Sequence, residues 1–170
     1  WTAPASNGNT ALGGPWSIVG YRIEQSADNG VTWVALADPL TPASTVTYTA
    51  YGLTNGLNYQ FRITALTQAG SGAPAFISGT PMTTPGAVQG LVVSPSDGFV
   101  TLNWRAPLSN GGSVITGYQL EYCTPWCATP ATLAENNIDP LATSFTLNGL
   151  TNGSTYNFRL RARTAAGLDP

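Results

Sequence analysis

The chain has 170 residues, of which 8% are charged and 42% hydrophobic, and its formal net charge is −2. All six of its basic residues are arginine, and it contains no histidine and no lysine. It therefore lacks imidazole bases, histidine metal ligands, Schiff-base lysines and the basic surface that binds nucleic acids. We predict that it is not an enzyme, that it holds no metal or cofactor, and that it binds no nucleic acid.

The length and the distribution of apolar residues set two further limits. A chain of 170 residues is long for one small domain and has room for two cores of ordinary size. No apolar run approaches the roughly 20 residues that cross a bilayer. We therefore predict two small domains and no insertion into a membrane.

The sequence contains an internal repeat. Three motifs occur twice: Gly-Tyr at 20 and 117, Gly-Leu-Thr-Asn-Gly at 52 and 149, and Trp-x-Ala-Pro-x-Ser-Asn-Gly at 1 and 104. The first two recur after 97 residues and the third after 103, so the first copy carries six extra residues, which fall around 9–16. A repeat of this length indicates two copies of one domain.

Turn residues and alternating polarity predict strands in both copies. In the first copy, Asp28-Asn29-Gly30 is a strong signal for a tight hairpin. In the second, apolar and polar residues alternate over 99–105 and 156–163, which is the period of a strand with one buried face. No window has a long apolar stripe of helical period, and 13 Pro and 19 Gly interrupt the chain. We expect antiparallel sheets and no substantial helix.

Three features together resemble tandem fibronectin type III domains: a Trp on the second strand, a Gly-Tyr pair on the third, and Leu-x5-Tyr-x-Phe leading into a strand that ends Ala-x-Thr-x-Ala-Gly. The resemblance implies an all-β fold of two tandem immunoglobulin-like β-sandwiches. It divides the chain into domains at 1–81 and 87–170 and a short Pro-containing linker at 82–86, which should be stiff and extended. In the second domain it places strands A, B, C, E and F at 87–94, 99–105, 115–122, 144–147 and 156–163.

The same resemblance implies that each domain is incomplete within this chain. In family terms Trp1 already lies on strand B, so the first domain lacks strand A. Pro170 lies where strand G of the second domain begins, so that domain lacks strand G. An unpaired strand edge readily pairs with another polypeptide. We expect a longer polypeptide or a neighbouring chain to supply the missing strands.

Two Leu and Tyr pairs resemble the tyrosine corner of the family. Leu53 precedes Tyr59, and Leu150 precedes Tyr156, with the same spacing. The resemblance implies that each phenol packs on its Leu and forms a hydrogen bond with the backbone where the chain crosses between sheets.

Cys123 and Cys127 are the two cysteines of the chain. They align with Ser26 and Gly30 of the first copy, at the turn after the third strand. Without histidine they are too few to hold a structural zinc, and Cys-x3-Cys is not the spacing of thioredoxin-like redox sites. We predict a structural disulfide, which favours an extracellular or cell-surface location in a secreted protein.

The outer face of the strand predicted at 156–163 carries three arginines: Arg159, Arg161 and Arg163. One interpretation is a weak stripe for anions or sulfated glycans. The other, which we favour, is that they pair across strands with Glu121, as Arg62 would with Glu24.

Two tryptophans are not explained by core periodicity. Trp16 lies among the six extra residues of the first copy, and Trp126 lies inside the predicted disulfide loop. Exposed Trp can stack on a sugar ring or anchor a protein partner, or it can fold over its own sheet edge. We expect these loops at opposite ends of the chain, where they would allow copies or neighbouring repeats to stack head to tail.

The leading functional hypothesis is a non-enzymatic extracellular structural or adhesion module in a longer repeat array or surface filament. Alternatives are a spacer region of a secreted polysaccharide-degrading enzyme and a virion or tail-fibre decoration domain. The composition, rich in Thr, Ser and Asn and free of Lys, is similar to that of bacterial surface repeats. Its partners would be neighbouring repeats, copies of itself, or a glycan or protein ligand. Asn152-Gly153-Ser154 is a formal glycosylation sequon, which matters only in a eukaryotic secretory host.

Overall fold

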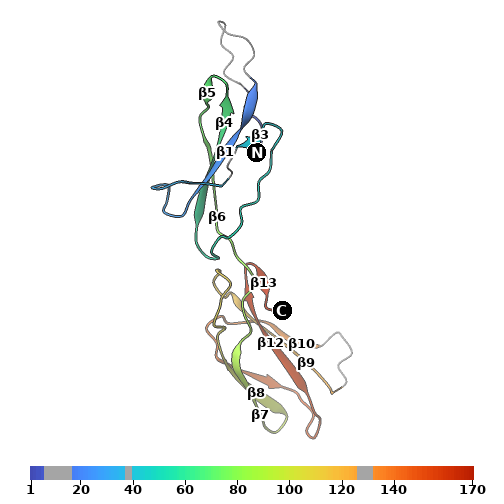
Figure 1. Ribbon diagram of the computed structural model, residues 1–170. Coiled ribbons are helices and arrows are strands. Elements are labelled where there is room, and N and C mark those ends of the chain that lie inside the picture. The colour runs from blue at the N-terminus through green and yellow to red at the C-terminus, as the bar shows by residue number, and fades with distance from the viewer. Residues whose placement is uncertain (6–16, 37–39, 126–131) are drawn as a thin grey trace. The chain divides into compact units, whose positions relative to one another are not determined.

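The structure is a computed structural model that describes residues 1–5, 17–36, 40–125 and 132–170 (Figure 1). These residues form strands and turns, with no helix among them, so the all-β prediction is confirmed. The chain divides into two compact units, Trp1–Pro81 and Met82–Pro170. No helix in the described part of the chain is long and apolar enough to cross a membrane.

Unit 1 is built on one antiparallel sheet. Its strands are β1 (Ile18–Ser26), β2 (Val34–Ala35), β3 (Thr41–Pro42), β4 (Tyr59–Thr67), β5 (Gly70–Ser71) and β6 (Ala75–Gly79). The long strands β1 and β4 pair side by side, β2 and β3 add to the outer side of β1, and β5 and β6 add to β4. The sheet therefore has β1 and β4 at its centre.

Unit 2 contains two sheets. Its strands are β7 (Gln89–Pro95), β8 (Phe99–Arg105), β9 (Gly117–Cys123), β10 (Thr132–Ile138), β11 (Ser144–Asn148), β12 (Asn157–Thr164) and β13 (Gly167–Leu168). One sheet has the order β10-β9-β12-β13 and the other β11-β8-β7. The five strands predicted for this repeat agree with β7, β8, β9, β11 and β12 to within two residues at each end.

The core of unit 2 lies between its two sheets. It joins Val100, Leu102 and Trp104 of β8 to residues of the opposite sheet, among them Leu120 and Leu160. Every second residue of β8 points inward, as its alternating sequence predicts. Burial of these side chains is the main source of stability for a sandwich of this size.

The Gly-Tyr motif has the same structural role in both units. A Cβ on Gly20 would lie 2.5 Å from the Thr41 carbonyl oxygen, and one on Gly117 would lie 2.8 Å from that of Ile138. Only glycine lets the neighbouring strand come this close. The tyrosine that follows is buried in each unit.

The structure agrees only in part with the edge strands that the sequence predicts to be missing. Trp1 lies outside the assigned strands, but its amino group donates to the Val46 carbonyl oxygen as the Trp104 amide of β8 donates to that of Thr143, so its placement on strand B stays a prediction. No strand precedes β1 among the described residues of unit 1, and the absence of strand A there stays a prediction. The predicted absence of strand G in the second repeat is not confirmed, because β13 pairs with the end of β12.

The segment predicted as a linker, 82–86, is hydrogen-bonded within unit 2. The Thr83 amide donates to the Gly111 carbonyl oxygen, and the Gly86 amide donates to that of Ser109, both at 2.9 Å. Gly111 has a φ of +68°, and a Cβ on it would collide with the Thr83 carbonyl oxygen. These contacts make the segment a part of unit 2.

Candidate functional site

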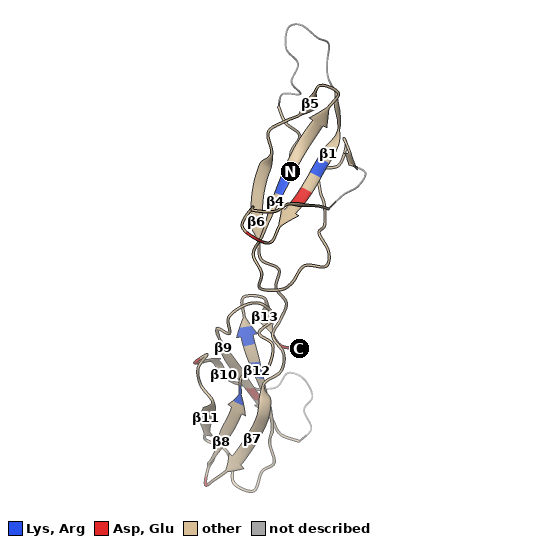
Figure 2. Cartoon of the chain, turned by 60° about the vertical axis from the view of Figure 1, so that its left-hand side comes forward, with Lys and Arg blue, Asp and Glu red and all other residues tan. Residues whose placement is uncertain are grey.

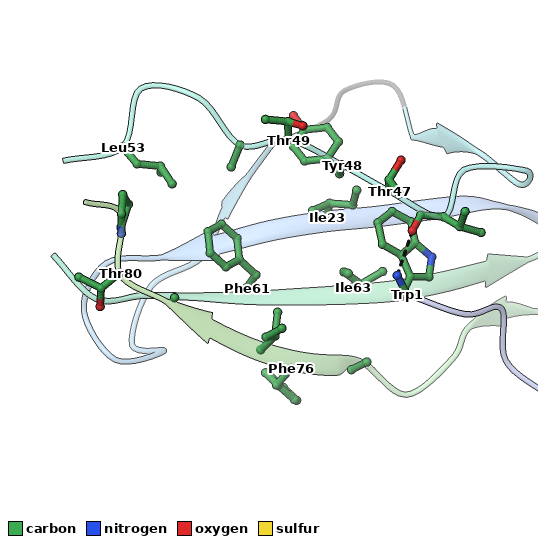
Figure 3. Close-up of a pocket in the computed structure, with 16 residues that line it drawn as sticks. Trp1, Ile23, Thr47, Tyr48, Thr49, Leu53, Phe61, Ile63, Phe76 and Thr80 are labelled. Carbon is green, nitrogen blue, oxygen red and sulfur yellow. Dashed lines mark hydrogen bonds between the residues drawn. The ribbon is translucent and has the colours of Figure 1, made fainter. Parts of the chain in front are cut away.

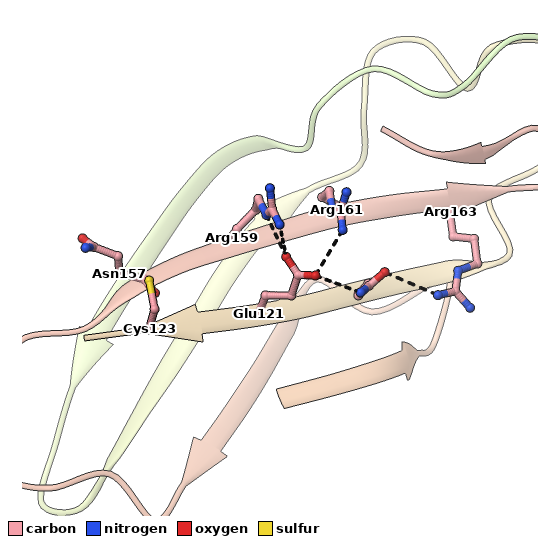
Figure 4. Close-up of polar contacts among 7 residues, drawn as sticks. Glu121, Cys123, Asn157, Arg159, Arg161 and Arg163 are labelled. Carbon is pink, nitrogen blue, oxygen red and sulfur yellow. Dashed lines mark hydrogen bonds and ion pairs between the residues drawn. The ribbon is translucent and has the colours of Figure 1, made fainter. Parts of the chain in front are cut away.

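The outer face of the β9-β12 pair carries a compact ionic cluster (Figure 4). Glu121 on β9 lies directly opposite Arg159 on β12 in the strand register. Its carboxylate lies 2.5 Å from Arg159 and 3.1 Å from Arg161. The Glu121 side chain is only 11% exposed, whereas that of Arg159 is 57% exposed. One shielded carboxylate therefore orients two guanidinium groups.

Arg163 has different partners on the same face. Its guanidinium donates to the Asn136 side-chain oxygen at 2.5 Å and to that of Gln119 at 3.5 Å. Gln119 in turn donates to Glu121 at 3.1 Å. The structure thus brings the three predicted arginines together in one hydrogen-bonded network. With Glu121 as its acidic member, the network has a net positive charge.

Unit 1 has the matching pair on β1 and β4, where Figure 2 shows basic and acidic residues on neighbouring strands. Arg62 donates two hydrogen bonds to Glu24, at 2.6 and 2.9 Å. These bonds are the main cause that lowers the pKa of Glu24 and raises that of Arg62. The Arg62 guanidinium also lies 4.4 Å from the ring centre of Trp33, whose edge meets Phe76. The sequence had no signal for this aromatic contact, because it depends on where the turn between β1 and β2 places Trp33 relative to β4 and β6.

The hairpin after β1 is held by Asp28. Asn29 and Gly30 both have positive φ, as a tight Asn-Gly turn requires. The Asp28 carboxylate accepts hydrogen bonds from the Ser26 hydroxyl at 2.6 Å and from the Thr32 amide and hydroxyl at 2.9 and 2.6 Å. These bonds, that from Ser26 first, lower the pKa of Asp28 to about 2.

This low pKa predicts a local loss of order in acid. Because ionised Asp28 is favoured in the fold, its contribution is complete above its ordinary pKa of 3.8 and is lost as the pH falls toward about 2. We expect local opening of this turn to become more frequent as the pH falls through that window, which lowers the protection of the Thr32 amide against exchange with solvent deuterons. An Asp28→Asn variant should lack it. An NMR titration of the Asp28 carboxyl with its midpoint near pH 4 would contradict the lowered pKa.

Both predicted tyrosine corners have matching geometry. The Tyr59 hydroxyl accepts a hydrogen bond from the Thr54 amide, and the Tyr156 hydroxyl accepts one from the Thr151 amide, each at 3.1 Å. The bond from Thr151 is the main cause that lowers the pKa of Tyr156. Leu53 and Leu150, the family partners of these phenols, are half-buried.

The side chain of the sequon residue is already engaged. Asn152 accepts a hydrogen bond from the Gly98 amide at 2.9 Å and donates one to Asp97 at 2.6 Å. Both partners lie in the turn between β7 and β8. A glycan on the Asn152 amide nitrogen would compete with the bond to Asp97 and loosen this turn.

Cys123 ends β9 and lies opposite Asn157 of β12. Its predicted disulfide partner, Cys127, lies outside the described residues, so the pairing stays a prediction. Closing a loop of about five residues would stabilise the turn by about 2 kcal/mol.

The disulfide prediction has a direct chemical test. We expect that alkylation of the unreduced, unfolded chain adds no alkyl group and that alkylation after reduction adds two, one at each cysteine. A Cys127→Ser variant should be alkylated once without reduction. Double alkylation of the parent chain before reduction would show that the bond is absent.

Trp16 and Trp126, the two predicted contact residues, also lie outside the described residues.

Sequence reasoning did not foresee an apolar groove in unit 1 (Figure 3). It has a volume of about 790 Å³, and none of its lining residues has a charged side chain, although the amino group of Trp1 is charged. Its floor includes Ile23 of β1 and Phe61 and Ile63 of β4, and its far wall is the segment 47–50. Trp1 closes one side, where its amino group donates to the Val46 carbonyl oxygen at 2.9 Å.

The acidic residues and the cysteine that the structure describes lie apart from one another. No group of three or more His, Cys, Asp or Glu residues in the described part of the chain is placed to hold a metal ion. Asp169 is buried beside β12, and burial is the main cause that raises its pKa, while Arg161 opposes the shift. The remaining ionic contacts described above join neighbouring strands.

Comparisons with known proteins found similar segments in much longer proteins. Cardiac-type myosin-binding protein C of Rattus norvegicus is 29% identical over 170 residues, which cover 98% of this chain and 13% of that protein. Neural cell adhesion molecule L1.1 of Danio rerio is 33% identical over 158 residues, covering 91% of this chain and 12% of that protein. The chain therefore spans only a small part of the relatives that it matches.

The solved structures agree at the level of fold. A crystal structure of titin domains superposes with a TM-score of 0.59 at 22% sequence identity, over 87% of this chain and 50% of that one. The family model described as "Fibronectin type III domain" matches residues 84–170, which is all but the first two residues of unit 2. Because that match covers half of its length, the chain belongs to the fibronectin type III domain family.

Proposed function

We propose that this chain is a non-enzymatic structural module that spaces or presents neighbouring domains within a longer array of repeats. Its fibronectin type III domain is related to domains of muscle and adhesion proteins, which supports a structural or adhesive role. An extracellular setting, in a repeat array or surface filament, is the finer part of the proposal. The relation to an adhesion molecule and the predicted disulfide support it.

One observation carries the proposal: the same scaffold contacts recur in both units. Trp1 meets Tyr21 at 5.4 Å between ring centres, and Trp104 meets Tyr118 at 5.4 Å. An Arg–Glu pair and a tyrosine hydroxyl accepting from a threonine amide also recur 97 residues apart. These contacts join neighbouring strands or hold turns, which supports a structural role.

A force experiment tests the structural role. In a polyprotein of four copies of the chain, each unit 2 should unfold in one step under a pulling force. Its 89 residues would lengthen the polyprotein by about 30 nm. A gain in length without discrete steps would contradict the structural role. Hydrolysis of a glycoside or an ester by the purified chain would contradict the non-enzymatic part of the proposal.

Head-to-tail assembly through Trp16 and Trp126 is the partner proposal that follows from the repeat. An interface anchored on a tryptophan typically loses 2 kcal/mol or more when that residue is removed. We therefore expect Trp16→Ala and Trp126→Ala each to shorten assemblies measured by light scattering, with Trp33→Ala as the control. Assemblies of unchanged length in both variants would mean that these loops only pack on their own units.

A further inference from the structure

The strand β11 ends in an Asn-Gly pair, a dipeptide that can modify itself. The backbone nitrogen of such a glycine attacks the side-chain amide carbon of the asparagine, expels ammonia and closes a succinimide ring. Water then opens the ring at either carbonyl group and leaves aspartate or isoaspartate. Glycine hinders the attack least, because it has no Cβ. The chain has six Asn-Gly pairs, and five lie in the described residues: those of Asn29, Asn55, Asn110, Asn148 and Asn152.

The peptide group between Asn148 and Gly149 is not held by the sheet. The residue opposite Asn148 in β8 is Phe99, whose carbonyl oxygen accepts a hydrogen bond from the Ser96 amide and so faces away from β11. In an antiparallel ladder the backbone groups of Asn148 then also face away from β8. That side of β11 is an edge of its sheet. Neither the Asn148 carbonyl oxygen nor the Gly149 amide has a hydrogen bond within the described residues, so this peptide group can rotate without breaking one.

The side chain of Asn148 is also unrestrained. It is exposed, and it has no hydrogen-bond partner in the part of the chain that the structure describes. A Cβ placed on Gly149 would meet no atom within 4 Å. The space around the two reacting groups is therefore open, and the side chain can reach the conformation from which the ring closes.

Two pairs of unit 1 have their nucleophile engaged. The Gly30 amide donates to the Ser26 hydroxyl at 2.8 Å, and the Gly56 amide donates to the Pro81 carbonyl oxygen at 2.9 Å. A backbone nitrogen must lose its hydrogen to attack a carbonyl carbon. Each of these nitrogens must first break its hydrogen bond and leave its acceptor.

The other two pairs of unit 2 have their asparagine side chain engaged. The Asn110 side-chain oxygen accepts from the Gly112 amide at 3.0 Å, and the Gly111 amide donates to the Ser109 hydroxyl at 3.2 Å. The side chain of Asn152 is held from both ends by the turn between β7 and β8. Attack at either asparagine requires these bonds to open.

We propose that Asn148 is a site of spontaneous modification in the folded chain, where succinimide formation precedes that at the other four described Asn-Gly pairs. The reaction consumes water, releases ammonia and adds a negative charge at the end of β11. In the isoaspartate product the main chain runs through the side-chain carbon and is longer by one methylene group. That extra carbon lies two residues before Leu150, whose amide donates to the Gly98 carbonyl oxygen at 2.9 Å. The inference does not depend on the proposed role in a repeat array.

A time course of the intact chain at mildly alkaline pH tests the order of reaction. Fragmentation mass spectrometry locates each deamidated residue, and methyl transfer by a protein isoaspartyl methyltransferase marks the isoaspartate. Since each of the other four pairs must break at least one hydrogen bond, we expect Asn148 to react at least about 5-fold faster than any of them. In urea these differences should disappear, because all the pairs then have the same reactive neighbour. Asn148→Gln should remove the early product and leave the other rates unchanged, because glutamine would have to close a larger ring.

The Asn148→Asp variant separates the effect of the charge from that of the longer backbone. It carries the new carboxylate on an ordinary main chain, so the Leu150 amide should stay as protected from exchange as in the parent. In the isoaspartate form we expect that amide to exchange at least about 5-fold faster, because its hydrogen bond to Gly98 is displaced.

Three results would overturn the proposal. The first is a rate at Asn148 no higher than at the other four pairs of the folded chain. The second is the same ratio of rates in urea, since the sequence and not the fold would then set the order. The third is equal protection of Leu150 in the isoaspartate and Asn148→Asp forms, which would show that the longer backbone leaves the end of β11 unchanged.

Discussion

Replacing Trp104 by alanine is expected to lower the free energy of unfolding of unit 2 by about 3–5 kcal/mol. Trp104 is 3% exposed and packs edge-on against Tyr118 in the centre of the core. Its indole N–H has no hydrogen-bond partner among the described residues, so the loss is one of packing and buried area. A change of this size is a large part of the total stability of a small domain.

The matched variant is Trp1→Ala, because Trp1 makes the same edge contact with Tyr21. Trp1 is half-buried and borders the open groove, so we expect a loss of only about 1–2 kcal/mol, confined to unit 1. Urea unfolding followed by the amide signals of Leu120 and Ile23 measures the two units separately. Equal losses in the two variants would contradict the difference in packing that the structure shows.

Replacing Glu121 by glutamine is expected to destabilise unit 2 by about 2 kcal/mol. The change leaves the shape of the side chain but removes the charge that holds Arg159 and Arg161. Of the two arginines, Arg161 should lose more interaction energy, since its side chain is only 20% exposed and its Nε atom is buried with no partner among the described residues. The same urea experiment at low salt measures the loss.

The companion variant for the cluster is Arg159→Gln. The Arg159 side chain is 57% exposed, so water replaces much of what it loses, and we expect a cost below about 1 kcal/mol. Raising the ionic strength should lower the cost of Arg159→Gln by a larger fraction than that of Glu121→Gln, because salt screens the exposed charge more than the shielded Arg161 contact. A larger loss for Arg159→Gln than for Glu121→Gln would contradict a cluster centred on the carboxylate.

The strands of unit 2 could be predicted because their sequence pattern and their surroundings agree. Val100, Leu102 and Trp104 alternate with polar residues, and β8 has a paired strand on each side and a sheet beneath it. Local pattern and tertiary contacts then favour the same structure. The opposite position of Arg159 and Glu121 follows from the same register.

The segment 47–51 shows where this reasoning stops. It aligns with β11 and has the composition of a strand, yet it forms none in unit 1. A strand is stable only when a neighbour satisfies its backbone, and the residues of a segment do not reveal whether that neighbour is present. The groove and its lining could not be foreseen for the same reason. The second contact of Glu121, with Arg161, also depends on side-chain reach rather than on register.

The central claim is that equivalent residues form the same contacts in both units, whereas β11 is paired and its counterpart 47–51 has no paired strand among the described residues. Amide hydrogen exchange of the intact chain at neutral pH tests it most directly, by comparing 47–51 with its counterpart β11. We expect the β11 amides that face β8, those of Phe145 and Leu147, to be strongly protected, and the amides of Tyr48 and Ala50 to exchange at nearly the rate of an unfolded peptide. Equal protection of the two segments would contradict the account.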